Sequence, residues 1–343
     1  MSREGKMDKP TNNSITDVPG IKVGHATHVE AATGCTVILC PDGTVGSADV
    51  RGSAPGTREI PAVQPINLVQ YVNAIYLGGG SAFGLEGATG VMRYLEENRI
   101  GFDTGVAIVP IVPGAVLFDL PVGRADIRPD AEMGYTACLN ATEGKVEGGN
   151  VGAGTGASVG KVRGMEFAMK GGLGNASIKT GDLVVGAIVA VNCLGDVTDP
   201  QTGEILAGSL NDDKKSLANS IELLKSTLKS AGFNEHDTST DTSPTSNTTI
   251  AVVASNAKLD KSGAKKVAMM AHDGLARTIN PIHTMFDGDT IFALATGEIE
   301  ADVTTVGALA AETLAIAVVD AIKKAKSAYG LLSYEELKNR RHR

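Results

Sequence analysis

The stretch that organises this sequence is Ser246-Asn247-Thr248-Thr249-Ile250-Ala251-Val252-Val253-Ala254. A polar segment at 234–246, rich in Thr, Ser and Asp, ends there, and an apolar run typical of a buried strand begins. A hydroxyl residue that opens a strand directly after a polar linker indicates self-cleavage. The Thr248 hydroxyl could attack the carbonyl carbon of Asn247, shift the acyl group from nitrogen to oxygen, and leave an ester for water to split.

Cleavage at this point would give a new chain that begins with Thr248, which would carry both a hydroxyl nucleophile and a free α-amine. Such an amine has an unperturbed pKa of about 7.7–8.0, so it can act as a base toward the hydroxyl near neutral pH. The alternative is an ordinary linker that meets a strand, with Thr248 present for its β propensity. The stretch alone favours this ordinary interpretation.

The composition indicates a folded protein that does not bind nucleic acid. Hydrophobic residues make up 42% of the 343 residues and charged residues 20%, which allows a sizeable core. The net charge of −8 and the lack of a basic stripe argue against a nucleic-acid partner. The first residues lack the apolar core of a signal peptide, and no apolar run reaches the length of a membrane span. We therefore expect a cytoplasmic protein with no membrane partner.

Neither a metal site nor a cofactor site is predicted. The four cysteines are scattered without CxxC spacing, which indicates neither zinc binding nor a disulfide scaffold. The glycine-rich segment at 78–84 precedes a predicted helix, but its spacing fits neither the dinucleotide nor the Walker pattern. The segment at 148–161 has Thr155 where the first Walker glycine should be, and Val162 where Ser or Thr should bind magnesium. Tight turns or a substrate-facing loop explain these glycines better.

Two helices are predicted after the organising stretch. Residues 261–279 carry Val267, Met270, Ala271 and Leu275 on one helical face, and Pro281 ends the segment. Residues 306–328 form an Ala-rich helix, whose small side chains predict either tight helix packing or a contact between subunits.

Five stretches in the same order resemble those of the self-processing aminopeptidases and amidases of peptidase family S58, the DmpA-type or P1 family, close to the nylon-oligomer hydrolases. They are Asp49-Val50-Arg51-Gly52-Ser53-Ala54-Pro55-Gly56-Thr57-Arg58, Gly79-Gly80-Ser81-Ala82-Phe83-Gly84-Leu85, Met169-Lys170-Gly171-Gly172-Leu173-Gly174, Asn247-Thr248-Thr249-Ile250 and Phe286-Asp287-Gly288-Asp289-Thr290. Each is weak alone, but all five in order make chance an unsatisfactory explanation. The resemblance extends from about Ile15 to Ala328.

The resemblance implies an α+β fold, a four-layer αββα sandwich similar to that of ornithine acetyltransferases and of N-terminal nucleophile hydrolases. It implies a flexible arm at 1–15 and a single catalytic domain at 16–330. Self-cleavage would give an α chain, 1–247, which ends in a linker at about 234–246, and a β chain, 248–343. A homo-oligomer of such αβ protomers, a tetramer or larger, is also implied.

The same resemblance assigns roles to individual residues. Thr248 matches the N-terminal nucleophile and Asn247 the residue left at the end of the α chain. Asn192 matches the amide of the oxyanion hole, and Lys161 matches a lysine placed near the nucleophile in nylon-oligomer hydrolases. Either Lys161 or the Thr248 amine could be the general base.

Asp287 and Asp289 match the two-residue relay that follows the nucleophile. Relatives with a serine nucleophile carry Ser and Glu at these two places, so this sequence resembles the branch with a threonine nucleophile and Asp-x-Asp. Phe118 stands where some relatives have a catalytic tyrosine. Phenylalanine cannot donate a hydrogen bond, so that role is absent here or filled by another group.

The expected function is hydrolysis of amide bonds without a metal or other cofactor. The substrates would be short peptides, amino-acid amides or esters, or linear 6-aminohexanoate (nylon) oligomers. Two alternatives remain open at this point. One is acyl transfer of the ornithine acetyltransferase type, and the other is a non-catalytic protein that binds a small anion in its glycine-rich turns.

Overall fold

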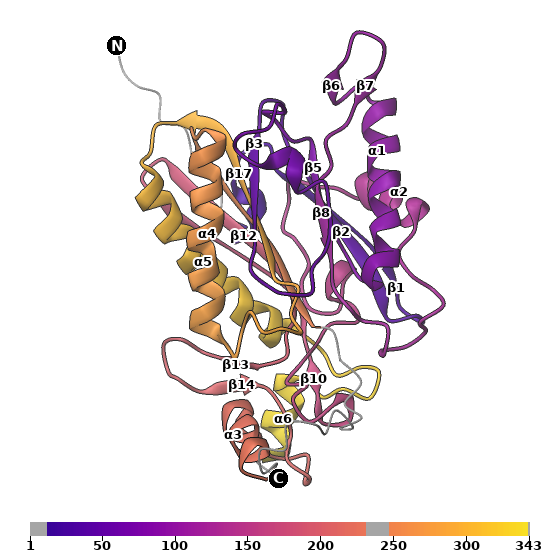
Figure 1. Cartoon of the computed structure of the whole chain (residues 1–343), viewed down its shortest axis with the longest axis vertical. Helices are drawn as coiled ribbons and strands as arrows, with labels where there is room; N and C mark the ends of the chain where they lie inside the picture. The colour runs from indigo at the N-terminus through magenta and orange to yellow at the C-terminus, as the bar shows by residue number, and fades with distance from the viewer. Residues whose placement is uncertain (1–11, 231–246, 342–343) are drawn as a thin grey trace.

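The computed structural model describes residues 12–230 and 247–341, and its core is built from two five-stranded sheets (Figure 1). The predicted linker at about 234–246 and residues 1–11 of the predicted arm lie outside the described residues. The first sheet has the spatial order β1-β2-β5-β8-β4. Its strands are β1 (Lys22–His28), β2 (Thr33–Leu39), β5 (Ala74–Gly78), β8 (Gly114–Val116) and β4 (Gly56–Arg58).

The second sheet has the spatial order β11-β12-β15-β17-β3. Its strands are β11 (Gly172–Thr180), β12 (Leu183–Asn192), β15 (Thr248–Ala257), β17 (Thr290–Ile299) and β3 (Val45–Val50). Strand β15 lies in the centre, antiparallel to β12 and parallel to β17. The predicted strand after residue 247 is therefore the middle of this sheet.

Strand β15 is buried on both faces, which explains its unbroken apolar run. Val253 packs into a core between the second sheet and its helices. Val252 packs into a different core, between the two sheets, together with Leu77 of the first sheet and Phe292 of β17. Successive side chains of a strand point to opposite faces, so one apolar run supplies both cores.

Two pairs of helices cover the outer faces of the sheets and complete four layers (Figure 1). Helices α1 (Gly87–Glu97) and α2 (Ala131–Leu139) pack on the first sheet through a third core that includes Val91 and Cys138. Helices α4 (Lys261–Thr278) and α5 (Val303–Lys324) pack on the second sheet. The predicted αββα sandwich is confirmed, as is the helix predicted at 261–279.

Shorter elements extend this sandwich. They are the hairpin of β6 (Phe102–Asp103) and β7 (Ile108–Val109), the pair β9 (Ser158–Val159) and β10 (Met169–Lys170), the sheet of β13 (Asp196–Thr198), β14 (Ile205–Ala207) and β16 (Ile279–Asn280), and the helices α3 (Ser220–Ser230) and α6 (Tyr334–Arg341). The β6–β7 hairpin projects from the body (Figure 1).

An Ala-rich helix was predicted at 306–328; the structure has it as α5 at Val303–Lys324, so it begins and ends earlier than predicted. Its small residues pack against neighbouring elements of the chain. Glycines of neighbouring elements lie against its backbone: Gly174 of β11 against Ala317, and Gly274 of α4 against Ala311. Among the described residues, α5 alone is long and apolar enough to cross a membrane, contrary to the expectation from the sequence, but 61% of its apolar window is buried in the molecule. The packing of α5 is therefore that of a helix in the protein core.

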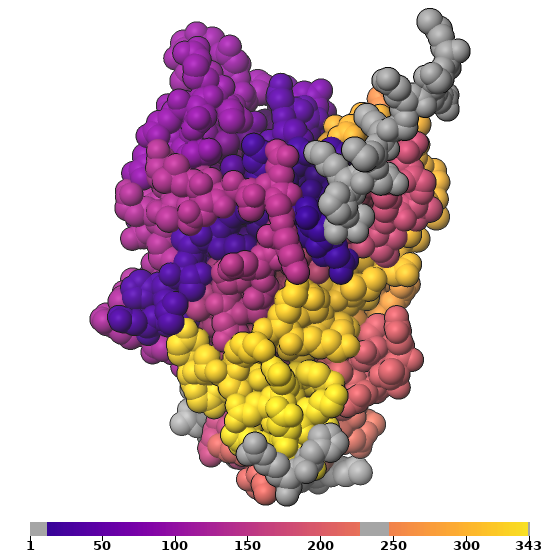
Figure 2. Space-filling view, turned by 180° about the vertical axis from the view of Figure 1, so that it is seen from behind, coloured from indigo at the N-terminus to yellow at the C-terminus, as the bar shows by residue number. Residues whose placement is uncertain are grey.

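Buried residues extend beyond both ends of the range predicted for the domain. Ser14 and Ile15, which fall within the predicted arm, are fully buried, and Ser14 caps a short 3₁₀ helix at Ile15–Asp17. At the other end, α6 lies beyond residue 330, and its Leu337 is 1% exposed within the core. The C-terminal segment covers the lower part of the molecule (Figure 2). A single buried leucine in a highly charged helix leaves no apolar periodicity to detect.

Candidate active site

The register of the second sheet brings together two residues that are far apart in the sequence. Asn192 is the last residue of β12, Thr248 is the first residue of β15, and the two are direct partners in the antiparallel pair. Side chains of such partners lie within contact distance of each other. Asn192 is 0% exposed and Thr248 is 2% exposed, so both are enclosed by the fold.

The peptide bond between Asn247 and Thr248 is held by groups on both sides. The Thr248 hydroxyl donates a hydrogen bond to the carbonyl oxygen of Asn247. The same oxygen accepts the backbone N–H of Gly288 at 2.9 Å, and the Asn247 N–H donates to the Phe286 carbonyl at 2.8 Å. The hydroxyl therefore lies against the carbonyl group that self-cleavage would attack, and that carbonyl already has a donor.

Asn192 is the centre of a buried hydrogen-bond network. Its Oδ1 accepts from the Lys161 Nζ at 2.9 Å and from the Ser158 backbone N–H at 2.9 Å. Its backbone carbonyl accepts from the same Lys161 Nζ at 3.0 Å. Its Nδ2 donates to the Phe118 carbonyl at 3.1 Å. Phe118 thus contributes its backbone carbonyl to the site, although its side chain cannot donate a hydrogen bond.

Burial changes the acidity of Lys161. Its side chain is removed from water, which disfavours the ammonium form and lowers its pKa to about 8, while nearby acidic groups such as Asp287 oppose this effect. A lysine with this pKa has a substantial neutral fraction near neutral pH, and it can accept a proton. Lys161 is hydrogen-bonded to Asn192, and Asn192 is the direct partner of Thr248 on the neighbouring strand.

Asp289 contacts the strand that carries Thr248. Its Oδ1 accepts the backbone N–H of Thr249 at 2.6 Å. Its Oδ2 accepts both the backbone N–H and the Nδ1–H of His283, at 3.1 Å and 2.8 Å. Asp289 is fully buried, so these donors replace the water that a carboxylate would otherwise bind.

Asp287 is also fully buried and has separate partners. Its Oδ2 accepts from the backbone N–H and the hydroxyl of Thr284, at 3.0 Å and 2.5 Å. Its Oδ1 accepts from the Leu194 N–H at 3.4 Å. Burial, with a further contribution from the charge of Asp289, raises the pKa of Asp287. The two carboxylates of the predicted relay therefore have different environments.

The turn between these carboxylates leaves no room for a side chain at Gly288. A Cβ at this position would lie 2.6 Å from the Ala54 carbonyl oxygen and 2.9 Å from the Thr248 hydroxyl. The Ala54 N–H donates to the Asp287 carbonyl at 2.8 Å, and the Arg51 N–H donates to the Asp289 carbonyl at 3.0 Å. The loop that follows β3 thus packs against the Asp-Gly-Asp turn, so these two sequence stretches meet in the fold.

All the residues predicted for the site are brought together by the fold: Asn247, Thr248, Asn192, Lys161, Asp287 and Asp289. The sequence reasoning missed three contributors, namely His283, Ser158 and the backbone N–H of Gly288. His283 lies six residues before Asp289, a spacing that matches no sequence motif, so only the fold reveals the contact. The donor at Gly288 is its backbone N–H, which every residue except proline has, so the residue type does not reveal it.

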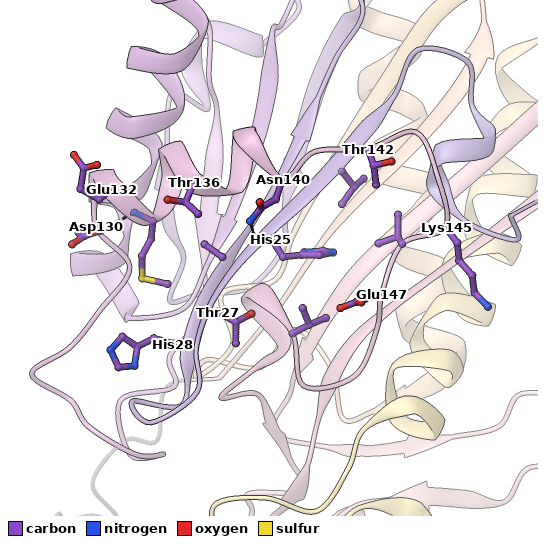
Figure 3. Close-up of a pocket in the computed structure, with 15 residues that line it drawn as sticks. His25, Thr27, His28, Asp130, Glu132, Thr136, Asn140, Thr142, Lys145 and Glu147 are labelled. Atoms are coloured by element: carbon purple, nitrogen blue, oxygen red, sulfur yellow. Dashed lines mark hydrogen bonds between the residues drawn. The ribbon is translucent and has the colours of Figure 1, made fainter.

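A separate pocket of about 740 Å³ lies between β1, α2 and the loop that follows α2 (Figure 3). Its lining includes His25, Thr27, Asn140 and Glu147, and none of the predicted site residues. Burial lowers the pKa of His25 to about 4. Across 12–230 and 247–341, no group of three His, Cys, Asp or Glu side chains is arranged to hold a metal ion.

Solved structures with the same arrangement define the class of fold. The L-aminopeptidase D-Ala-esterase/amidase of Ochrobactrum anthropi, described as a variant of the N-terminal nucleophile hydrolase fold, matches with a TM-score of 0.69. The match covers 96% of this chain and 93% of that chain at 18% identity. A β-aminopeptidase of Burkholderia sp. matches with a TM-score of 0.67 at 20% identity, covering 98% and 96%. The fold is that of N-terminal nucleophile hydrolases.

Residues 13–334 match the model of peptidase family S58, so the chain belongs to that family and is a hydrolase that acts on amide bonds. It is similar to an uncharacterised aminopeptidase of Mycobacterium leprae, with 45% identity over 94% of this chain and 93% of the relative. It is also similar to a 6-aminohexanoate-oligomer endohydrolase of Kocuria sp., with 31% identity over 90% of this chain and 85% of the relative. These relationships support aminopeptidase or amidase activity.

Proposed function

We propose that the chain is made as a precursor that cuts itself between Asn247 and Thr248, and that Thr248 is then the nucleophile of the amide hydrolase. The observation that carries this proposal is the position of the Thr248 hydroxyl against the Asn247 carbonyl, whose oxygen also accepts the Gly288 N–H. If the segment before Thr248 were only a linker joined to a strand, there would be no reason for a hydroxyl and a backbone N–H to meet at the Asn247 carbonyl group.

Self-cleavage starts with attack of the Thr248 Oγ on the carbonyl carbon of Asn247. Lys161 in its neutral form takes the hydroxyl proton, and the Gly288 N–H stabilises the negative oxygen. The bond between the carbonyl carbon and the Thr248 nitrogen breaks, and that nitrogen takes up a proton to become an amine. Water then hydrolyses the ester that joins Asn247 to the Thr248 oxygen.

Substrate hydrolysis repeats this chemistry with an external amide. The Thr248 Oγ attacks the substrate carbonyl, the new α-amine or Lys161 takes the proton, and that proton passes to the leaving amine. Once the Asn247 carbonyl has moved away, the Gly288 N–H is free for the substrate oxyanion. Asn192 Nδ2 carries a second hydrogen beyond the one bonded to Phe118. One lost donor of this kind costs on the order of 2.7–4 kcal/mol of transition-state stabilisation in other hydrolases.

The substrates we propose are short peptides, amino-acid amides or esters, and linear 6-aminohexanoate oligomers. Exposed apolar side chains beside the cleavage point support substrates with an apolar segment. Met285 is 75% exposed and Phe286 is 48% exposed, and the Phe286 carbonyl is bonded to Asn247. An aliphatic chain next to the scissile amide would cover this apolar surface.

We also propose that αβ protomers assemble into a homo-oligomer, a tetramer or larger. The protomer exposes large apolar side chains that an assembly could cover, among them Ile66 at 94%, Leu68 at 80% and Val106 at 94%. Val106 lies in the loop of the projecting β6–β7 hairpin.

The decisive experiment replaces Thr248 with valine, which has nearly the same shape but no hydroxyl. We expect Thr248→Val to remain a single chain of full length. We expect its kcat on an amino-acid anilide to fall about 10⁴- to 10⁶-fold, the range seen when other hydrolases lose their nucleophile. Intact mass and N-terminal sequencing measure the first effect and a rate assay the second.

The matched control is Thr249→Val, the same change one residue further along β15. The hydrogen bond from the backbone N–H of residue 249 to Asp289 is retained, so this variant should cut itself and keep its activity. A Thr248→Val protein that is cleaved, or that keeps its activity, would refute the proposal.

A further inference from the structure

His283 has a backbone conformation that L-residues rarely adopt. Its φ is +58°, in the left-handed region, which costs most side chains roughly 1–2 kcal/mol. Both its backbone N–H and its ring Nδ1 point at one oxygen, the Asp289 Oδ2, at 3.1 Å and 2.8 Å. The carboxylate can only accept, so Nδ1 carries the hydrogen in this contact. A strained residue with two donors on one buried acceptor indicates a functional constraint.

Asp289 needs these donors because it is fully buried. Within the described part of the chain, the His283 ring is the only side-chain donor bonded to it, at 2.8 Å. Its other oxygen, Oδ1, is occupied by the Thr249 N–H at 2.6 Å. The carboxylate therefore joins His283 directly to the backbone of the residue that follows the nucleophile.

A second histidine ring lies beside that of His283. His272 of α4 meets it edge to face, with the ring centroids 4.8 Å apart and the ring planes at 73°. The His272 Nε2 lies 3.2 Å from the Asp49 carbonyl oxygen. Burial, with a contribution from the charge of His283, lowers the pKa of His272 to about 3, so His272 is neutral and packs as an uncharged ring. It has no hydrogen bond to Asp289, and the two histidines therefore have separable roles.

We propose that His283 is a positioning residue for both self-cleavage and hydrolysis. By holding the Asp289 Oδ2 with two donors, it directs Oδ1 to the Thr249 N–H and so holds the Thr248 backbone, and later its α-amine, in place. Without the ring, the carboxylate is free to rotate away from the strand. This inference rests on the proposed role of Thr248 as the nucleophile.

The test compares two substitutions that both tolerate a left-handed φ, His283→Gly and His283→Asn. Only asparagine supplies a donor, Nδ2, at the place of the ring Nδ1. We expect His283→Gly to slow self-cleavage and to lower kcat about 10- to 100-fold, by analogy with the loss found when outer-shell hydrogen-bond partners of metal ligands are removed, with KM changed less than about two-fold. We expect His283→Asn to recover kcat to within about five-fold of the unaltered protein.

The control for packing is His272→Gln, which removes the neighbouring ring but keeps a donor for the Asp49 carbonyl. We expect its kcat to stay within about three-fold. The proposal is overturned if the Asn variant is as slow as the Gly variant, if the Gly variant is fully active, or if His272→Gln causes an equal loss. The Thr248→Val protein distinguishes failure of this proposal from failure of the proposed function. If Thr248→Val is cleaved, Thr248 is not the nucleophile. If Thr248→Val stays uncut but His283→Gly is fully active, only the positioning role of His283 is refuted.

Discussion

At the scale of single residues, the site depends on ionisable groups that are removed from water. Lys161, Asp287 and Asp289 are all nearly inaccessible, and each is surrounded by donors or acceptors from segments distant in sequence. Burial lowers the pKa of Lys161 and raises that of Asp287, and both shifts favour the uncharged form. A lysine with a pKa of about 8 can exchange a proton near neutral pH, as amide hydrolysis requires.

This tuning predicts the pH dependence of self-cleavage. In the uncut chain the Thr248 nitrogen is part of a peptide bond, so it cannot be the base. Lys161 must be neutral to take the proton, and its neutral fraction rises as the pH increases through about 8. The rate of cleavage should therefore increase from pH 7 to pH 9 and level off above, as measured by gel analysis of freshly translated precursor at each pH.

Two lysine substitutions check the assignment. Lys161→Met should cut slowly and lose the increase with pH, whereas Lys145→Met, at an exposed position, should follow the unaltered profile. An unchanged profile for Lys161→Met would show that another group accepts the proton.

At the scale of secondary structure, the position of the second sheet depends on close contact with α5. Gly174 of β11 lies directly against the α5 backbone, and a Cβ there would overlap the Ala317 carbonyl oxygen and the Ala321 nitrogen. Backbone atoms cannot move aside as the end of a long side chain can. Glycine on the strand and alanines on the helix together allow the two elements to approach.

We therefore expect Gly174→Ala to lower the free energy of unfolding by about 3 kcal/mol or more, because α5 must move away from the sheet. Urea unfolding monitored by circular dichroism measures the loss. The comparison is Gly181→Ala, in the turn between β11 and β12, where nothing lies within 4 Å and only the left-handed φ of +60° opposes the side chain. That variant should lose only about 1–2 kcal/mol. Equal losses would mean that the contact with α5 does not limit the packing.

At the scale of the whole molecule, the proposed cut falls at the start of the central strand of the second sheet. After cleavage, β15 would still be paired with β12 on one side and β17 on the other, and its side chains would still fill two cores. The new end at Thr248 can shift locally, but the β chain has no route out of the sandwich without unfolding.

The two chains should therefore stay together after cleavage. We expect size-exclusion chromatography with light scattering to give one species that contains both chains, with a mass that is a multiple of 35.2 kDa. The chains should separate only in denaturant. Release of either chain under native conditions would contradict the central place of β15.

Features that depend on neighbours along the chain could be predicted from the amino-acid sequence. The apolar run after Thr248 specifies a strand buried on both faces, and the apolar spacing after residue 260 specifies α4. The family resemblance carried by the five motif stretches implied the four-layer fold and pointed to the six residues now found together. Local periodicity records which face of an element is buried, so such features can be read without coordinates.

The groups that bond to those residues could not be predicted in this way, because they come from distant parts of the chain. His283, Ser158 and the Gly288 N–H entered the site through contacts set by sheet register and by the turn at 284–289. The burial of Leu337 in α6 likewise depends on a core assembled from distant segments. The lowered pKa of Lys161 arises from the same cause, because desolvation depends on everything packed around the group. Hydrogen bonds and burial across the fold depend on three-dimensional proximity, which residue types and spacing along one chain do not specify.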